Sequence, residues 1–264
     1  MLNLIKLYLL KKKILKCIKT EIMNLTQKKC WVVILGMMLS CSVIASEVSI
    51  GLYFGKIFAM PGDVKVGRKD GSHEVFHDVT WKDRSFELPF YYSLRVLYWP
   101  NTDSDTGLAL DFTHAKLYSS LRSPVTVSRV KADGVQQTQE ILGDSFSRLA
   151  FSHGYNYITL NALYRSSTEG DDSLSDTSAY LGAGFGIAVP HVEIQFAGTK
   201  IDNYKPVGLV FQGMAGITFG SGTDVPLNAE YKLSSGDAAI TLSDDARIEL
   251  SPLLHHLSVG PILK

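Results

Sequence analysis

The 264-residue sequence contains only three cysteines and nine prolines, and its formal net charge is zero. All three cysteines, Cys17, Cys30 and Cys41, lie within the first 45 residues. If that segment is removed on export, the remaining chain has no thiol and no disulfide. Thiolate catalysis, cysteine-based zinc sites and iron–sulfur clusters are then excluded. With 45% hydrophobic and 20% charged residues, the composition also excludes collagen-like, coiled-coil and wholly disordered chains.

The zero net charge conceals an uneven distribution. Residues 1–45 contain eight lysines and one acidic residue, Glu21, which leaves 18 basic and 25 acidic groups for residues 46–264. An acidic excess of this kind argues against a polyanion-binding groove spread over the domain. We therefore expect no nucleic-acid partner.

The basic N-terminal segment has the features of a secretory signal peptide. A pair of lysines precedes an apolar run at 31–39, and small or branched residues follow at the usual cleavage spacing. Because Met23 gives this signal a conventional length, we expect a signal peptide at 23–45 and an upstream extension at 1–22, with Met1 or Met23 as the start. The alternatives are a genuine basic amphipathic arm and a lipoprotein processing site at Cys41.

The rest of the chain has no apolar run near the ~20 residues that a membrane-spanning helix needs. It contains instead eight segments of roughly ten residues in which apolar residues alternate with polar or small ones, as in strands. The segments are 47–59, 89–99, 107–118, 156–165, 179–189, 208–220, 227–235 and 254–263.

The connections between these segments alternate in length. Long ones follow the first, third, fifth and seventh segments, and shorter ones follow the second, fourth and sixth. This alternation is typical of outer-membrane barrels, and lipid permits only helices or closed barrels as spanning structures.

The pattern therefore predicts an all-β protein. Residues 46–264 form an eight-stranded antiparallel transmembrane β-barrel with long extracellular loops in a bacterial outer membrane. We expect the barrel assembly machinery as a partner during biogenesis, although Lys264 replaces the terminal aromatic residue of many such barrels. The alternative is a soluble periplasmic β-sandwich or lipocalin-like binder, which would turn the same apolar faces inward.

Polar residues on the opposite strand faces would point into a lumen that is too narrow, with eight strands, for an open pore. We expect a buried polar and ionic network there, because a charge in a low dielectric must be paired. A second interpretation makes Glu230 a proton acceptor tuned by burial and a nearby cation. The inward residues are Arg95, Asp111, Thr113, Asn161, Arg165, Gln212, Glu230 and Lys232.

The seven histidines are all predicted at the extracellular end of the barrel, at or beyond strand ends. Neutral imidazoles and carboxylates at one rim are what a metal site or a general acid/base pair requires. For each histidine the alternative is a loop residue without a catalytic role. Four adjoin strand ends and could be held rigidly: His114, His153, His191 and His256. The others are His73, His77 and His255.

Several motifs stand out from the strand pattern. They are Asp111-Phe112-Thr113-His114-Ala115-Lys116, His153-Gly154-Tyr155-Asn156, Thr159 to Arg165, Tyr180 to Gly186, Pro190-His191-Val192-Glu193, Glu230-Tyr231-Lys232 and His255-His256. Together they resemble the lipid A oxidase family, outer-membrane barrels related to rhizobial enzymes. The resemblance covers most of the chain from about Ser93 onward. The Phe-Thr-His-Ala-Lys and Pro-His-Val-Glu motifs are its most specific parts.

The resemblance implies oxidation of the proximal glucosamine of lipid A to 2-aminogluconate. Molecular oxygen would accept the electrons, hydrogen peroxide would be released, and a divalent metal remains an open alternative. The partner would be lipid A or lipopolysaccharide in the outer membrane. No NAD or flavin held in the usual way is expected, because the glycines at 182–186 lack a βαβ context.

This chemistry needs a base for the hydroxyl proton at the anomeric carbon. We expect His114 or His191 as base or metal ligand, with Glu193 and Glu230 as carboxylate partners. Lys116 would meet lipid phosphates near the membrane interface. Substrate contacts are expected from Lys116, His153, Asn156, Lys232 and His256.

Two other functions stay open. A lipid A deacylase would need a serine–histidine pair with an acid, but Ser152 and His153 are adjacent and would face opposite ways in a strand. A non-catalytic barrel would stabilise the envelope or present its loops to a host surface.

Overall fold

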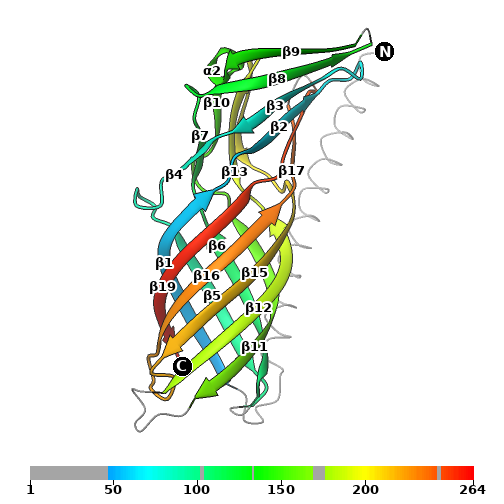
Figure 1. Cartoon of the computed structure of the whole chain (residues 1–264). Coiled ribbons are helices and arrows are strands. Elements are labelled where there is room, and N and C mark those ends of the chain that lie inside the picture. The colour runs from blue at the N-terminus through cyan, green and yellow to red at the C-terminus, as the bar shows by residue number, and fades with distance from the viewer. Residues whose placement is uncertain (1–46, 102–103, 133, 169–175, 243–244) are drawn as a thin grey trace, which may run out of the picture. The chain divides into compact units, whose positions relative to one another are not determined.

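Eight strands, each antiparallel to its neighbours, close into a barrel in the computed structural model of the chain (Figure 1). The order around the barrel is β1-β19-β16-β15-β12-β11-β6-β5. The predicted fold is confirmed, and the strands begin and end within a few residues of the expected bounds. They are β1 (Glu47–Ala59), β5 (Tyr92–Trp99), β6 (Thr106–His114), β11 (Tyr157–Thr168), β12 (Thr177–Ala188), β15 (Gly208–Phe219), β16 (Leu227–Gly236) and β19 (Leu253–Leu263).

The structure describes residues 47–101, 104–132, 134–168, 176–242 and 245–264. The expected signal peptide at 23–45 and the upstream extension at 1–22 lie outside these ranges. Within these ranges, no helix has both the length and the apolar character needed to cross a membrane.

Large apolar side chains cover the outside of the barrel. Leu181, Phe185 and Phe211 are each at least 60% exposed, whereas their strand neighbours Tyr180 and Gln212 are buried. A soluble sandwich would bury the first set, and a membrane barrel presents it to lipid. The apolar faces therefore point outward, and the soluble alternative is wrong.

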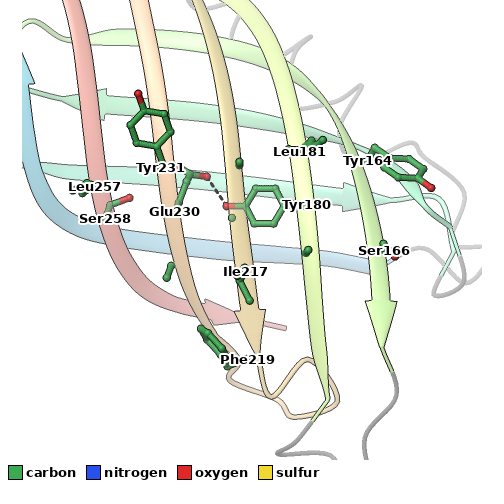
Figure 2. Close-up of a pocket in the computed structure, with 14 residues that line it drawn as sticks. Tyr164, Ser166, Tyr180, Leu181, Ile217, Phe219, Glu230, Tyr231, Leu257 and Ser258 are labelled. Carbon is green, nitrogen blue, oxygen red and sulfur yellow. Dashed lines mark hydrogen bonds between the residues drawn. The ribbon is translucent and has the colours of Figure 1, made fainter.

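The lumen holds the predicted network of charges. Arg95 donates to Asp111 at 2.9 Å and to Glu230 at 2.5 Å, and Lys232 lies 3.2 Å from Asp111. All four side chains are fully buried. Behind the outer wall, the Tyr180 hydroxyl donates to Glu230 at 2.5 Å (Figure 2). Two cations thus face two carboxylates, and charge is balanced where solvent is excluded.

The register of the barrel explains this network. Arg95 on β5 is the direct partner of Asp111 on β6, so the two side chains leave the pleat on the same face. Gln212 then links Asp111 at 3.2 Å to Asn161 at 2.8 Å across the lumen. The lumen is filled by side chains, as expected for eight strands.

The long connections form two further sheets at one end of the barrel. One is β14-β13-β10-β7-β4 and the other is β17-β18-β2-β3-β8-β9. The first contains β4 (Trp81–Asp83), β7 (Leu117–Ser119), β10 (Phe146–Phe151), β13 (His191–Phe196) and β14 (Thr199–Tyr204). The second contains β2 (Gly62–Gly67), β3 (His73–Val79), β8 (Pro124–Lys131), β9 (Gly134–Ile141), β17 (Ala238–Thr241) and β18 (Arg247–Leu250).

A hydrophobic core joins the two sheets. The ring of Phe146 lies 5.1 Å from that of Phe76 and 4.8 Å from that of Phe196. The short helix α2 (Leu142–Ser145) precedes β10, which pairs with β13 and β7. Residues 146–151 therefore form β10 of this separate sheet and do not extend the barrel strand β11.

Candidate functional site

The end of the barrel that carries the two sheets also carries the histidines. His114 is the last residue of β6, His191 is the first of β13, and His153 lies between β10 and β11. The other four lie in β3, namely His73 and His77, and near the start of β19, namely His255 and His256.

His114 is held by Asn156. Its Nδ1 lies 2.8 Å from Asn156 Oδ1, while Asn156 Nδ2 donates to the carbonyl oxygen of His153 at 3.1 Å. Since the amide nitrogen is committed to that carbonyl, Oδ1 acts as acceptor and the His114 proton resides on Nδ1. Nε2 is buried and has no hydrogen-bond partner among the described residues. His114 therefore offers an uncommitted lone pair, which is what a general base needs.

Two neighbours fix the orientation of the His114 ring. Tyr92 stacks on it, with ring centroids 5.1 Å apart and planes at 18°. The backbone of Gly154 packs closely against the hydrogen bond between His114 and Asn156. A Cβ built at Gly154 would come within 2.4 Å of both His114 Nδ1 and Asn156 Oδ1. Its φ of +98° is also one that side-chain-bearing residues rarely adopt. Glycine is required at this position for both reasons.

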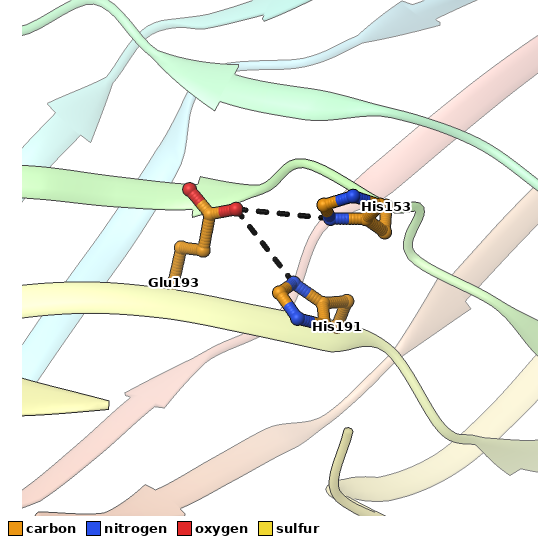
Figure 3. Close-up of side chains that lie close together, drawn as sticks. All are labelled: His153, His191 and Glu193. Atoms are coloured by element: carbon orange, nitrogen blue, oxygen red, sulfur yellow. Dashed lines mark ion pairs between the residues drawn. The ribbon is translucent and has the colours of Figure 1, made fainter. Parts of the chain in front are cut away.

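A second group lies beside the first, where His153, His191 and Glu193 converge (Figure 3). Residues 191 and 193 are two apart on β13, so they share a face of the strand. Burial raises the pKa of Glu193, but hydrogen bonds from Ser152 and Arg148 outweigh burial and hold it below its usual range. The carboxylate is therefore an anion at neutral pH. These three residues are the ones in the described chain that could hold a metal ion.

Ser152 and His153 do interact, contrary to the expectation from strand geometry. The Ser152 Oγ lies 3.0 Å from His153 Nδ1, because the chain turns at this point and the two side chains do not alternate. Ser152 donates its proton to Glu193, and the same His153 nitrogen faces both groups. A catalytic triad instead passes the serine proton to histidine, whose other nitrogen contacts the acid. The arrangement is not a deacylase triad.

A crevice of about 440 Å³ connects the His114 group to the outside of the barrel. Ile158, which is 39% exposed, lies on the outward face of β11 and lines the crevice together with the buried His114 and the exposed His153. Tyr204 of β14, 58% exposed, lies at its edge. The crevice is therefore bordered both by an outward-facing apolar side chain and by the two imidazoles. Its lining is Pro89, Tyr92, Phe112, His114, His153, Asn156, Tyr157, Ile158, Val189 and Tyr204.

A larger hollow of about 640 Å³ lies on the outer wall between β11 and β19 (Figure 2). Ala179, Ala215, Gly216 and Ala229 line it and thin the wall there. Its surface is almost wholly apolar, and the Glu230 carboxylate beneath it is bound to Tyr180 and Arg95. This apolar outer surface suits contact with lipid chains.

Three predicted site residues are not at the rim. Glu230 and Lys232 belong to the lumen network, and His256 is fully buried beside Ser234 at 2.8 Å and Tyr157 at 3.3 Å. All three point inward because they lie on the inner faces of β16 and β19. A membrane lipid cannot reach them.

Lys116 was expected to face lipid phosphates, but it lies elsewhere. It is 5% exposed, and its Nζ donates to the carbonyl oxygens of Glu87 at 3.1 Å and Leu88 at 2.6 Å. The strand β6 ends at His114, so the alternation that would place Lys116 outward no longer holds. Its ammonium group holds the connection before β5.

Other residues of the site were missed from the sequence. Arg148 contacts Glu193, and Asp202 contacts His191. Tyr92 and Tyr204 border the crevice. No local signal identifies Arg148 or Asp202, because strand pairing brings them in from residues far apart.

The closed barrel with an apolar exterior and a filled polar lumen defines the class of protein. It is an eight-stranded outer-membrane β-barrel, and its location is a bacterial outer membrane.

The chain is similar to solved structures of three such proteins. Neisserial surface protein A has 14% identity over 83% of this chain and 99% of that chain, with a TM-score of 0.38. Ail, the attachment invasion locus protein of Yersinia pestis, has 14% identity, coverage of 83% and 97%, and a TM-score of 0.26. OprG from Pseudomonas aeruginosa has 9% identity, coverage of 83% and 94%, and a TM-score of 0.33. No family model matches the sequence, and the search of curated proteins gave no match.

Proposed function

We propose that this barrel is a lipid A oxidase, which converts the proximal glucosamine of lipid A to 2-aminogluconate with molecular oxygen as oxidant. The observation that carries the proposal is the crevice lined both by the outward-facing Ile158 and by His114. A substrate held in the membrane by its acyl chains can present its sugar there without leaving the bilayer. The motif containing His114 is also among the most specific parts of the resemblance described above.

The position of the crevice suits a lipid with a sugar headgroup. Phe112 and Ile158 on the outward barrel face offer apolar contact, and His114, His153 and Asn156 offer polar contact next to them. In outer-membrane barrels the long connections lie outside the cell. The crevice then lies where acyl chains give way to the sugars of the outer leaflet.

The proposed reaction has two steps, an oxidation and a hydrolysis. In the first, the anomeric carbon loses its hydrogen and its hydroxyl group loses its proton, which forms a lactone, and the two electrons and two protons reduce oxygen to hydrogen peroxide. In the second, water opens the lactone to the carboxylic acid. His114 Nε2 accepts the hydroxyl proton in the first step. The anomeric hydroxyl must be free, since a phosphate there leaves no proton to remove.

The remaining residues have distinct roles in this proposal. Asn156 holds the tautomer of His114, and His153 contacts the sugar at the opening of the crevice. His191 and Glu193 lie behind His153 and position it. Glu230, Lys232 and His256 are assigned to the structure of the lumen, and Lys116 to the connection before β5.

Mass spectrometry of lipid A from cells with and without the gene tests the proposal. An oxygen-dependent gain of one oxygen atom on the proximal sugar is expected. Because oxygen leaves as hydrogen peroxide, the added atom must come from labelled water and not from labelled dioxygen. Unchanged lipid A in cells that contain the folded barrel would reject the oxidase and favour a non-catalytic barrel. Label from dioxygen would reject the two-step chemistry.

A further inference from the structure

His153, His191 and Glu193 each direct one ligand atom into a shared space (Figure 3). The Nδ1 atoms of His153 and His191 lie 3.8 Å and 3.7 Å from Glu193 Oε1. All three ligand atoms lie within 4.8 Å of one another. Ligands about 2.1 Å from an ion at tetrahedral angles lie roughly 3.4 Å apart. The His153 side chain is 61% exposed, so it is free to complete the small approach that binding needs.

The His191 ring supplies a second, independent observation. The His191 side chain is only 13% exposed, and its buried Nδ1 has no hydrogen-bond partner among the described residues. A buried polar atom without a partner is costly and needs an explanation. Its other nitrogen, Nε2, lies 3.5 Å from Asp202 Oδ1. A carboxylate behind an imidazole is the arrangement that orients histidine toward a metal.

The nearby cations do not occupy the shared space, and the Ser152 hydroxyl, which contacts Oε1 of Glu193 and Nδ1 of His153, must turn away when an ion binds. Arg148 contacts Oε2 of Glu193, whereas the imidazoles face Oε1. Lys200 contacts Oδ2 of Asp202 at 2.9 Å, whereas His191 faces Oδ1. Each cation is thus paired with the carboxylate oxygen that faces away from the imidazoles. Hydrogen-bonded carboxylates of this kind are usual among metal ligands.

We propose that His153, His191 and Glu193 bind one divalent transition-metal ion. Two imidazoles and a carboxylate suit ions such as Zn²⁺, Co²⁺ or Fe²⁺, whereas Mg²⁺ and Ca²⁺ prefer oxygen ligands. Three protein ligands leave a coordination position open, as in catalytic sites. The proposal is independent of lipid A oxidation, because an ion here would also tie β13 to the connection between β10 and β11.

Metal binding by the folded barrel tests this directly. The protein, without a histidine tag, is refolded in detergent, stripped with a chelator and titrated with Co²⁺. One Co²⁺ per chain and a visible absorption spectrum of nitrogen and oxygen coordination are expected. Mg²⁺ at the same concentration should not displace it, and Zn²⁺ should.

Variants separate the site from other histidines. His191→Ala and Glu193→Gln should each weaken Co²⁺ binding at least 100-fold, and Asp202→Asn by about 10 to 100-fold. His77→Ala is the matched control, because His77 lies in β3 and pairs with Asp63 at 3.0 Å. Its Co²⁺ binding should equal that of the unaltered protein.

Folding of each variant is followed by heat-modifiable migration on gels. If a ligand variant fails to fold, the Co²⁺ affinity of the Asp202→Asn variant and the Co²⁺ spectrum of the unaltered protein still test the metal site. No bound Co²⁺ in the folded barrel, or equal affinity in the His77 and His191 variants, would overturn the proposal.

Discussion

Nδ1 of His114 lies 2.8 Å from Oδ1 of Asn156, which joins the last residue of β6 to the residue immediately before β11. This contact sets the tautomer of the imidazole and directs its free nitrogen away from the amide. The position of Asn156 in turn depends on the carbonyl of His153. A residue of the barrel wall and a residue of the connection above it therefore form a single unit.

Replacing the proposed base tests the catalytic role of this unit. His114→Gln should lower the rate of lipid A oxidation by 10² to 10⁴-fold, the usual contribution of a general base. The barrel should still fold, as judged by heat-modifiable migration. His73→Gln is the control, because His73 lies in β3, away from the crevice, and its oxidation rate should not change. An active His114→Gln enzyme would assign His114 to structure alone.

Gly154→Ala should disturb the same contact without touching either partner. The new Cβ would overlap His114 Nδ1 and Asn156 Oδ1, and the positive φ would add a cost of ~1–2 kcal/mol. Gly71→Ala has a similar φ of +84° but meets nothing within 4 Å. Urea unfolding in lipid vesicles should therefore show a larger loss for Gly154→Ala, with a matching loss of oxidation. Equal losses in the two variants would show that contact with His114 does not matter.

Filling the crevice from the lipid side should block the substrate. Ile158→Trp places an indole among the residues that line it, so kcat/KM for lipid A should fall at least tenfold. Leu160 lies on the same outward face of β11, is 53% exposed and does not line the crevice. Leu160→Trp should therefore leave kcat/KM unchanged. If both variants oxidise lipid A normally, the substrate does not enter by this route.

The lumen network should matter for stability. Arg95→Met leaves Asp111 and Glu230 without their shared cation, and removing one partner of a buried ion pair costs about 3–5 kcal/mol. Arg247→Met removes an exposed arginine, 60% accessible, that pairs with Glu249 at 2.7 Å. That change should cost less than ~1 kcal/mol. Urea unfolding in vesicles measures both, and similar midpoints would contradict a stabilising network.

The alternating strands were readable from the sequence because a pleated strand has a period of two. That rule puts Leu160 and Leu181 on outward faces and Arg95 and Asp111 on inward faces, which agrees with their exposure in the structure. The same rule also separates His255, which contacts Tyr231 at 2.6 Å, from the inward-facing His256. The same rule placed Glu230 and Lys232 inward, where they join the lumen network.

Strand alternation could not predict the side-chain contacts at the end of the barrel that carries the histidines. Ser152 meets His153 because the chain leaves the strand at a turn, and alternation ends with the strand. Lys116 departs from the outward face for the same reason, since it follows the end of β6. Arg148 reaches Glu193 across the pairing of β10 with β13, which no local pattern records.

By itself, the sequence determined the barrel, its location in the outer membrane, and the inward and outward strand faces. The reason is that side-chain alternation and the need to satisfy backbone hydrogen bonds in lipid can be read from each strand separately. The tertiary structure decided which histidines meet. Imidazoles from the end of β6, the turn after β10 and the start of β13 become neighbours only when the barrel closes and its long connections pair as sheets. That pairing is set by contacts between residues far apart in the chain.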